Sequence, residues 1–403
     1  MKQRVLVSAG DPSGDLLLSR VIFHLKEMGT QHGVDFEFRG LAGPKSEAAG
    51  VEIHGRCEDV AVVGLTEVVK KLPKIFGVLG QLEKMIPESD RVICVDMPDF
   101  NFRLAKMAKK RNIAVDYLVC PQVWAWREER VEEIRQLFRR VYPVLPFEET
   151  YLLERGVNAR YLGHPLRDIL PPRARKQKRE ELNIPDDVFA MAVLPGSRRS
   201  ELKRHLPILI EAWALFQKEA VRRHVEKPYR ALVPVATGIR REDLEAMLSK
   251  KHQAMLSAWL NSKEWQLCES SWDVMQASDF GWIASGTATL EAAYYQLPHI
   301  LFYRLSWLSA RIIKSLTSYF TGNEGMAGLP NILLESKVIP EILQDDLNPR
   351  RLAFETVELV SNTIRMNTMK KQLRFIPKRL GETGVAARMA EDLWGLWGLS
   401  RKS

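Results

Sequence analysis

Short runs of apolar residues alternate with longer helix-like segments along most of the chain. The runs fit buried strands, and the segments between them, such as residues 17–28 and 100–110, have the spacing of amphipathic helices. Strands that alternate with helices are typical of a parallel sheet that helices cover on both faces. The chain is therefore predicted to have an α/β fold. The apolar runs are RVLVS, DFEFRG, RVICVD, VDYLV, RRVYPVL and ARYLG, and later VFAMAVL, YRALVPVA, WQLCE, DFGWIAS and HILFYR.

The alternation is interrupted once, at residues 171–187, and then begins again. This stretch opens with two prolines and continues with a run of basic residues, which is typical of a domain linker that leads into a solvated helix. The sequence thus predicts an N-terminal domain (1–170), a linker (171–187), a second domain (188–345) and C-terminal helices (346–403). Ligands bind at the carboxyl ends of strands in open α/β sheets, so two such Rossmann-like sheets facing each other would make a cleft.

Composition narrows the class further. With 403 residues, 46% hydrophobic and 27% charged, the chain has globular proportions, which exclude a disordered, collagenous or coiled-coil protein. A net charge of +9 favours an anionic partner and leaves nucleic acid, nucleotide phosphates and anionic lipid open. The four cysteines form no C-x-x-C pair, which disfavours zinc ribbons and disulfide frameworks. No clear signal peptide or 18-residue apolar stretch occurs, so we expect a cytoplasmic protein.

Several nucleotide- and metal-binding motifs are absent from the sequence. There is no G-x-G, no G-x-x-x-x-G-K-[ST] and no H-E-x-x-H, which disfavours a dehydrogenase and a P-loop NTPase. The chain also lacks D-x-D, the commonest means of holding a metal–diphosphate in a sugar-nucleotide enzyme. We therefore expect phosphate chemistry that needs no metal or other cofactor and uses Arg, Lys, helix N-termini and backbone N–H groups.

The loop after the first strand, GDPSGD, combines glycines with carboxylates. Glycines let a ligand approach the backbone, and the following helix points its N-terminus at the loop. The carboxylates suit sugar hydroxyls better than phosphate; the alternative is a helix start that Ser13 or Asp15 caps. The residues predicted to bind the acceptor or donor sugar here are Gly10, Asp11, Ser13, Gly14 and Asp15.

Three further candidate loops follow strands of the first half. After RVICV come Asp96, a candidate general base on a sugar hydroxyl, and Asp99, which is better explained as a helix N-cap. For Asp96 the pattern favours catalysis and structure equally. Trp124 and Trp126 follow VDYLV and would stack on a sugar or pack in a core. His164 follows ARYLG and would bind a phosphate or hydroxyl, or be a loop histidine satisfied by backbone.

The second half contains two strand–turn–helix loops suited to anions. The sequence LPGSRRSE places Ser197 and Arg198 after a strand and before a helix, where the helix N-terminus and a guanidinium can bind phosphate. The sequence ASGTATLE repeats this plan, and its Glu291 can accept from ribose hydroxyls; the alternative is a capped helix with a favourable first-turn charge. Asn331, in GLPN, would orient a phosphate or hydroxyl or cap a helix. The predicted UDP-binding residues are Ser197, Arg198, Ser285, Gly286, Thr287, Glu291 and Asn331.

Taken in this order, these loops resemble the lipid-A-disaccharide synthase family, which are two-domain glycosyltransferases of the B-type fold. The resemblance extends from residue 8 to about residue 334. Asp11 stands where the family usually has Glu, and Cys120 begins a segment that usually reads Ser-Pro-Ser or Ser-Pro-Gln. The matching pieces are SAGDPSGD, VDMPDFNFRLAK, PQVWAWREERV, LPFE, YLGHPL, LPGSRRSE, ASGTATLEAA and GLPNILL.

The resemblance implies an inverting transfer of a 2,3-diacylglucosamine from UDP to the 6-hydroxyl of 2,3-diacylglucosamine 1-phosphate, a step of lipid A biosynthesis that releases UDP. It implies Asp96 as the general base, Arg198 as the diphosphate-binding arginine, Asn331 as a further important residue and Glu291 as the residue that holds the ribose. It also implies a C-terminal helix that crosses back to the first domain, for which residues 384–397 are the candidate. Exchange of C-terminal parts between subunits occurs in the family, so a homodimer stays open.

Because the substrates of this family are acylated, the resemblance also implies an enzyme peripherally associated with the inner face of the inner membrane. Residues 62–86 and 303–320 combine apolar residues at helical spacing with basic residues. Helices with this pattern can lie on anionic lipid. The alternative is that both helices pack on their domain cores. The residues predicted to contact the membrane are Leu72, Phe76, Leu79, Lys70 and Lys74.

Other classes of function stay open from the residues alone. One is another UDP-sugar enzyme of the same fold: a UDP-GlcNAc-type epimerase, or a transferase to a different lipid or soluble acceptor. The basic apolar stretch after residue 62 favours a lipid substrate over a soluble one. A nucleic-acid-binding protein is disfavoured, because much of the excess positive charge is confined to residues 173–179 and 365–379. A non-catalytic relative that keeps the fold is the remaining alternative.

Overall fold

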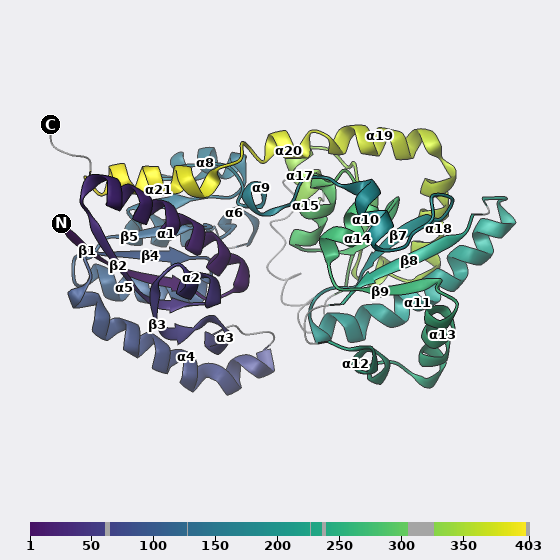
Figure 1. Cartoon of the computed structure of the whole chain (residues 1–403), viewed down its shortest axis with the longest axis horizontal. Coiled ribbons are helices and arrows are strands. Elements are labelled where there is room, and N and C mark those ends of the chain that lie inside the picture. The colour runs from purple at the N-terminus through teal and green to yellow at the C-terminus, as the bar shows by residue number, and fades with distance from the viewer. Residues whose placement is uncertain (61–64, 127, 226, 236–238, 305–325, 400–403) are drawn as a thin grey trace. The chain divides into compact units, whose positions relative to one another are not determined.

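The chain divides into two compact units in the computed structural model (Figure 1). One unit contains Met1–Ile169 together with Leu380–Ser403, and the other contains Leu170–Arg379. Each is built on its own parallel sheet, which confirms the prediction of two α/β halves. The structure describes all residues except 61–64, 127, 226, 236–238, 305–325 and 400–403.

The first unit has six parallel strands among its described residues, in the order β3-β2-β1-β4-β5-β6. The chain order reverses beside β1, so the loops that follow β1 and β4 are neighbours. The strands are β1 (Lys2–Ala9), β2 (Asp35–Ala42), β3 (Val51–Arg56), β4 (Arg91–Val95), β5 (Val115–Leu118) and β6 (Arg140–Tyr142). The helices are α1 (Pro12–His32), α2 (Pro44–Ala48), α3 (Cys57–Val60), α4 (Leu65–Met85), η1 (Ile86–Glu88), α5 (Pro98–Lys109), α6 (Val123–Trp126), α7 (Arg130–Leu137), α8 (Pro146–Leu153), α9 (Leu166–Ile169) and α21 (Val385–Leu396).

Strand β1 shows why this sheet is buried on both faces. Its side chains alternate between two apolar clusters: Leu6 packs with residues of α4 and α5, whereas Val5 and Val7 pack with residues of α1 and α21. The side chains of Val5, Leu6 and Val7 are all fully buried. A strand with this period and apolar residues on both sides can only lie in the middle of a helix-covered sheet.

The C-terminal helix α21 belongs to the first unit, where it packs against α1. Trp394 and Trp397 are buried beside Phe36 of β2, and the Trp397 indole donates to the buried carboxylate of Asp116 over 2.8 Å. Asp116 also receives the guanidinium of Arg139. Helix α21 and Trp397 thus complete the core that contains β1.

The second unit repeats the plan, with strand order β12-β11-β10-β7-β8-β9 and parallel pairing throughout. The strands are β7 (Phe189–Leu194), β8 (Tyr229–Pro234), β9 (Trp265–Cys268), β10 (Phe280–Ala284), β11 (His299–Tyr303) and β12 (Glu341–Leu343). The helices are α10 (Arg175–Glu181), α11 (Arg199–Arg222), α12 (Arg241–Ala246), α13 (Lys250–Asn261), α14 (Ser271–Ala277), α15 (Thr287–Tyr294), α17 (Leu329–Leu334), η3 (Gln344–Asp346), α18 (Pro349–Ser361), α19 (Thr363–Leu373) and α20 (Ile376–Arg379).

The predicted linker at 171–187 is wrong, because this stretch is an integral part of the second unit. It contains α10, and the Arg179 side chain in that helix is buried. The Arg179 guanidinium donates to the backbone carbonyls of Ala277, Pro185 and Val188. Because three carbonyls replace water around the Arg179 guanidinium, this side chain holds the segment in place. In a linker, a run of basic residues would instead be solvated. The predicted boundary at 345 is also too early, since the second unit extends to Arg379.

Among the described residues, no helix is both long and apolar enough to cross a bilayer. The same part of the chain contains no group of three or more His, Cys, Asp or Glu side chains arranged to hold a metal ion.

Candidate functional site

The first two candidate loops are brought together by the pairing of β1 with β4. Gly10 directly follows β1, and Met97 lies in the loop after β4. A Cβ atom at Gly10 would lie only 1.5 Å from the Met97 sulfur, so a larger residue at this position would displace the Met97 side chain. Gly10 and Met97, almost ninety residues apart in the sequence, thus lie together at the C-terminal ends of the strands of the first sheet.

Asp96 occupies the tip of β4 in an uncommon backbone conformation. Both Asp96 and Met97 have positive φ angles, of 47° and 48°, and neither is glycine. Each such residue costs of the order of 1 kcal/mol, and consecutive ones persist only where the surroundings impose them. Such outliers cluster at functional sites, and this pair lies at the residue predicted to be the base.

The electrostatic surroundings of Asp96 suit a proton acceptor. Partial burial raises the pKa of its carboxyl group, and the negative charge of Asp11 raises it further, although a hydrogen bond from the Met97 backbone acts in the opposite direction. A carboxylate with a raised pKa is a stronger base than one in water. The structure therefore places a carboxylate with a raised pKa next to the loop that follows β1.

The two acidic residues of the first loop have structural hydrogen bonds. Asp11 caps α1, because its carboxylate accepts from the backbone N–H groups of Ser13 and Gly14. Asp15 is buried and accepts from the backbone N–H groups of Gly43 and Ser46, and of Lys45 beside them.

The predicted sugar contact through Asp15 therefore needs correction. Its carboxylate is turned into the protein, where it joins α1 to the start of α2, and its lone pairs are used there. The cap that the sequence assigned to Ser13 or Asp15 is supplied by Asp11.

Trp124 is held by a carboxylate that sequence reasoning did not single out. The Trp124 indole N–H donates to Glu148 Oε1 over 2.7 Å, and the ring packs edge-on against Phe147. Glu148 also accepts from the backbone N–H groups of Val144 and Leu145. The only available signal was the matching piece LPFE, which contains Glu148. The side chain of Trp126 lies outside what the structure describes.

His164 is buried and uncharged. Its Nδ1 accepts from the backbone N–H of Leu166 over 3.1 Å, and burial lowers its pKa to about 4. A neutral ring whose Nδ1 is already used offers no cation to a phosphate. A charged contact to phosphate is therefore not supported. Backbone satisfies Nδ1, and a contact from Nε2 to a hydroxyl stays a prediction.

In the second unit, Arg198 lies at the start of α11 directly after the turn that ends β7. Gly196 in this turn has a φ of 109°, which only glycine adopts freely. The Arg198 guanidinium is 3.7 Å from Glu201 Oε1 and its side chain is 56% exposed, so it is free to reach an anion beside the helix N-terminus. Its neighbour Arg199 is instead paired with Asp243 at 3.1 Å.

His205, about two turns further along α11, was missed by sequence reasoning. It is buried; its Nδ1 lies 2.7 Å from the Pro195 carbonyl oxygen, and its Nε2 accepts from the Arg304 backbone N–H. This imidazole therefore joins the turn that precedes Ser197 and Arg198 to the end of β11. No short-range pattern signals such a role, because the two partners are about a hundred residues apart.

The predicted loop after β10 lies beside the one after β7, because those two strands pair. Ser285 is partly exposed, and Gly286 and Thr287 are exposed at the start of α15, with Gly286 at a φ of 149°. Glu291 is half-buried one turn along that helix and accepts from the Trp272 indole over 2.9 Å. Burial raises the pKa of Glu291.

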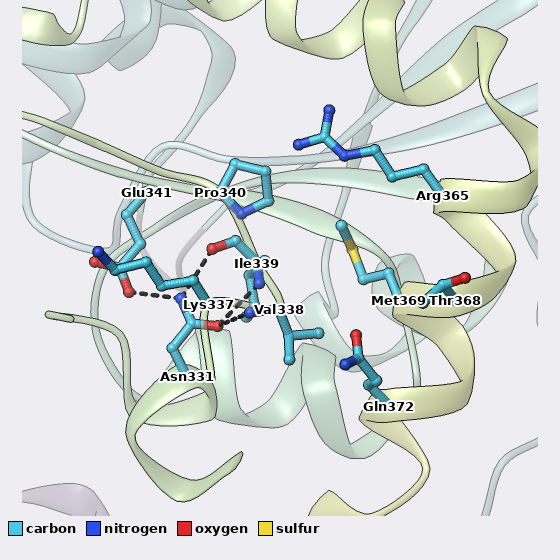
Figure 2. Close-up of a pocket in the computed structure, with 10 residues that line it drawn as sticks. All are labelled: Asn331, Lys337, Val338, Ile339, Pro340, Glu341, Arg365, Thr368, Met369 and Gln372. Carbon is cyan, nitrogen blue, oxygen red and sulfur yellow. Dashed lines mark hydrogen bonds between the residues drawn. The ribbon is translucent and has the colours of Figure 1, made fainter. Parts of the chain in front are cut away.

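Asn331 is fully buried, and its side chain is committed to the protein (Figure 2). Its amide nitrogen donates to the Ile339 carbonyl and to Glu341, and its amide oxygen accepts from the backbone N–H groups of Val338 and Ile339. A direct bond from Asn331 to UDP is therefore not what this geometry supports. The side chain instead shapes one wall of a cavity of about 540 Å³ that also reaches Arg365.

The predicted membrane residues on α4 separate into two groups. Phe76 is 48% exposed, with its ring beneath the Arg103 guanidinium, and Lys74 pairs with Asp59. Leu79 is buried in the core, so its predicted membrane contact is wrong: it faces the sheet. Leu72 is partly buried. The Lys70 side chain and the stretch 305–320 of the second predicted segment lie outside the described residues.

The two sheets and their covering helices define a fold class, the two-domain α/β architecture of B-type glycosyltransferases. The S. aureus MnaA–UDP co-structure matches with a TM-score of 0.62 and 12% identity, over 98% of this chain and 97% of that one. The calicheamicin glycosyltransferase CalG4 matches with a TM-score of 0.58 and 12% identity, over 98% of both chains. At these identities the likeness concerns the fold alone, and glycosyltransferases share it with UDP-GlcNAc 2-epimerases.

Sequence similarity distinguishes between these activities. The family model for lipid-A-disaccharide synthetase matches residues 5–389. Lipid-A-disaccharide synthase of Anaeromyxobacter dehalogenans strain 2CP-C is 34% identical over 98% of both chains, and that of Myxococcus xanthus is 35% identical over 97% of this chain and 96% of the relative. The chain therefore belongs to the lipid-A-disaccharide synthase family. It is a glycosyltransferase of lipid A biosynthesis, as predicted, and the epimerase alternative is disfavoured.

Proposed function

We propose that this enzyme transfers 2,3-diacylglucosamine from UDP to the 6-hydroxyl of 2,3-diacylglucosamine 1-phosphate, with inversion at the anomeric carbon. The observation that carries the proposal is Asp96: a strained, partly buried carboxylate with a raised pKa at the carboxyl edge of the first sheet. This is the chemistry that activation of an alcohol requires.

In the proposed step, the acceptor oxygen forms a bond to the anomeric carbon while its proton passes to the Asp96 carboxylate. The bond from that carbon to the diphosphate oxygen breaks, and its electron pair leaves with UDP. Because the nucleophile attacks opposite the leaving group, the configuration inverts. Alignment of the two substrates and removal of the proton together lower the barrier.

The second unit is proposed to bind the departing nucleotide. Arg198 and the N-terminus of the 24-residue helix α11 would stabilise the negative charge on the diphosphate. Ser197, Ser285, Gly286 and Thr287 would add backbone or hydroxyl donors, and Glu291 would accept from the ribose hydroxyls. Asn331 would act indirectly, by fixing the segment 338–341.

No metal or other cofactor is proposed, because a guanidinium and two adjacent helix N-termini supply positive charge at the loops after β7 and β10.

We further propose that the first unit meets the cytoplasmic surface of the inner membrane through α4. The exposed ring of Phe76 and the positively charged Arg103 side chain beside it give the combination of apolar and positive groups that interfacial helices use. This contact would give the active site access to acylated substrates.

The direct test is to incubate the purified protein with both acylated substrates in the presence of EDTA and to detect the disaccharide by mass spectrometry. We expect the disaccharide and UDP in equal amounts, at the rate seen without EDTA. Absence of the disaccharide would overturn the proposed transfer. Product that forms only after a divalent metal is added back would overturn the proposal that no metal is needed.

A further inference from the structure

The buried side chain of Asn101 on α5 holds the backbone of Asp96. The Asn101 amide nitrogen donates to the Asp96 carbonyl over 2.6 Å and to the Val95 carbonyl over 3.2 Å. Its amide oxygen accepts from the Ser8 hydroxyl over 2.6 Å. Asn101 is fully buried, so these bonds are shielded from water.

A second donor meets the same carbonyl. The hydroxyl of Tyr117 on β5, which is also fully buried, donates to the Asp96 carbonyl over 2.8 Å. The carbonyl oxygen of Asp96 thus receives two side-chain donors, from α5 and from β5.

These donors account for the backbone conformation at the tip of β4. Asp96 and Met97 both have positive φ, which is unfavourable for residues with a Cβ. The bend is maintained because the Asp96 carbonyl is turned into the protein, where it accepts two buried hydrogen bonds. Loss of the donors would leave that carbonyl buried without partners or let the strand tip relax.

We propose that Asn101 is a positioning residue for the transfer reaction: by binding the Val95 and Asp96 carbonyls, it fixes the strand-tip conformation that presents the Asp96 carboxylate. This inference rests on the proposed role of Asp96 as the base. Asn101 itself touches neither substrate, since all its polar atoms are engaged within the protein. Its contribution is therefore geometric, and displacement of a reacting group by about 1 Å can cost about 100-fold in rate.

The test is a double-mutant cycle of Asn101→Ala with Asp96→Ala, in which kcat, KM and the Kd for UDP are measured. We expect Asn101→Ala alone to lower kcat at least tenfold, with KM for the donor and the Kd for UDP within twofold of wild type. In the Asp96→Ala background, Asn101→Ala should lower the residual rate no further, because there is no base left to misplace.

Ser89→Ala is the matched control. Ser89 is a buried, hydrogen-bonded side chain that precedes the other end of β4, and its hydroxyl donates to the Met85 carbonyl. It should lower the melting temperature and leave kcat within twofold. Tyr117→Phe keeps the ring and removes the second donor, so a smaller loss of kcat is expected; it carries the test if Asn101→Ala does not fold.

The outcomes separate the two hypotheses. If Asp96→Ala kept near-normal turnover, the proposed base would be wrong. If Asp96→Ala were inactive but Asn101→Ala and Tyr117→Phe kept wild-type kcat, the base would stand and the positioning role would be wrong. An equal fold-loss from Asn101→Ala in both backgrounds would show a general structural effect and would also overturn the inference.

Discussion

The indole N–H of Trp124 donates to the buried carboxylate of Glu148 over 2.7 Å. The same carboxylate accepts from the backbone N–H groups of Val144 and Leu145, so it fastens the start of α8 to the tryptophan loop. Burial raises the pKa of Glu148 to about 7, against the effect of these three donors. The aromatic side chain predicted to meet a sugar is thus placed by an acidic residue on another element.

Replacing Glu148 by Ala should destabilise the first unit. The change leaves three buried donors without an acceptor, and each such group costs about 1–3 kcal/mol. We expect the free energy of unfolding to fall by about 2 kcal/mol or more in urea denaturation. Glu154→Ala, at the exposed end of the same helix, should change it by less than about 0.5 kcal/mol. Similar losses for the two variants would contradict the structural role.

Acidification should lower the stability of the fold through the buried imidazole of His164. Its pKa in the folded protein is about 4, below the usual value of 6.5, so the unfolded chain takes up the proton first. Stability is therefore lost as pH falls from about 6.5 to about 4, with a limiting slope of about 1.4 kcal/mol per pH unit. Glu148 has the opposite sign, because its raised pKa makes stability fall as pH rises from about 4.5 to about 7.

The comparison of wild type with His164→Asn isolates this effect, since the contribution of Glu148 is common to both proteins. Denaturation at a series of pH values should show a shallower loss of stability in the variant below pH 6.5. Equal slopes in the two proteins would mean that His164 is not held neutral.

Arg198→Ala should weaken UDP binding. The Arg198 guanidinium makes a long contact to Glu201 and its side chain is 56% exposed, so it is available for a charge-assisted bond to the diphosphate. Isothermal titration calorimetry should show the Kd for UDP rising about tenfold or more. Arg199→Ala is the matched control: this arginine already pairs with Asp243, and its loss should change the Kd by less than twofold. An unchanged Kd for Arg198→Ala would remove it from the nucleotide site.

Phe76→Glu should reduce binding to vesicles that contain anionic lipid. The change replaces an exposed ring on α4 with a charge that anionic headgroups repel. Phe23 on α1 has a similar exposure, 56%, and Phe23→Glu is the control. In co-sedimentation, we expect loss of bound protein for Phe76→Glu only. Equal binding by both variants and wild type would overturn the membrane role of α4.

The architecture was predictable from the sequence because apolar period and turn residues are local signals. The runs around Val5 and Ile93 read as buried strands, and the structure places both in the middle of the first sheet. The run of basic residues at 171–187 led to the wrong prediction of a linker. Arg179 in this run is buried against backbone carbonyls that include one about a hundred residues away. Composition cannot distinguish a solvated base from one that the fold encloses.

The candidate site was predictable in its loops but not in its supporting residues. Asp96 directly follows β4 and Arg198 ends the turn between β7 and α11, and both positions are visible in the sequence. Asn101, Tyr117 and Glu148 act through contacts that only the pairing of β1, β4 and β5 creates. Asp15 shows the converse: a carboxylate in a ligand-like loop is turned inward by the backbone N–H groups at the start of α2.

The central claim is that Asp96 takes the proton of the acceptor hydroxyl. The most direct measurement compares Asp96→Asn with wild type in the disaccharide assay, together with the Kd for UDP. Asparagine keeps the side-chain shape and cannot accept the proton as a carboxylate does, so kcat should fall by about 100-fold to 10,000-fold while the Kd stays within twofold. Turnover close to that of wild type, with the same Kd, would contradict the account.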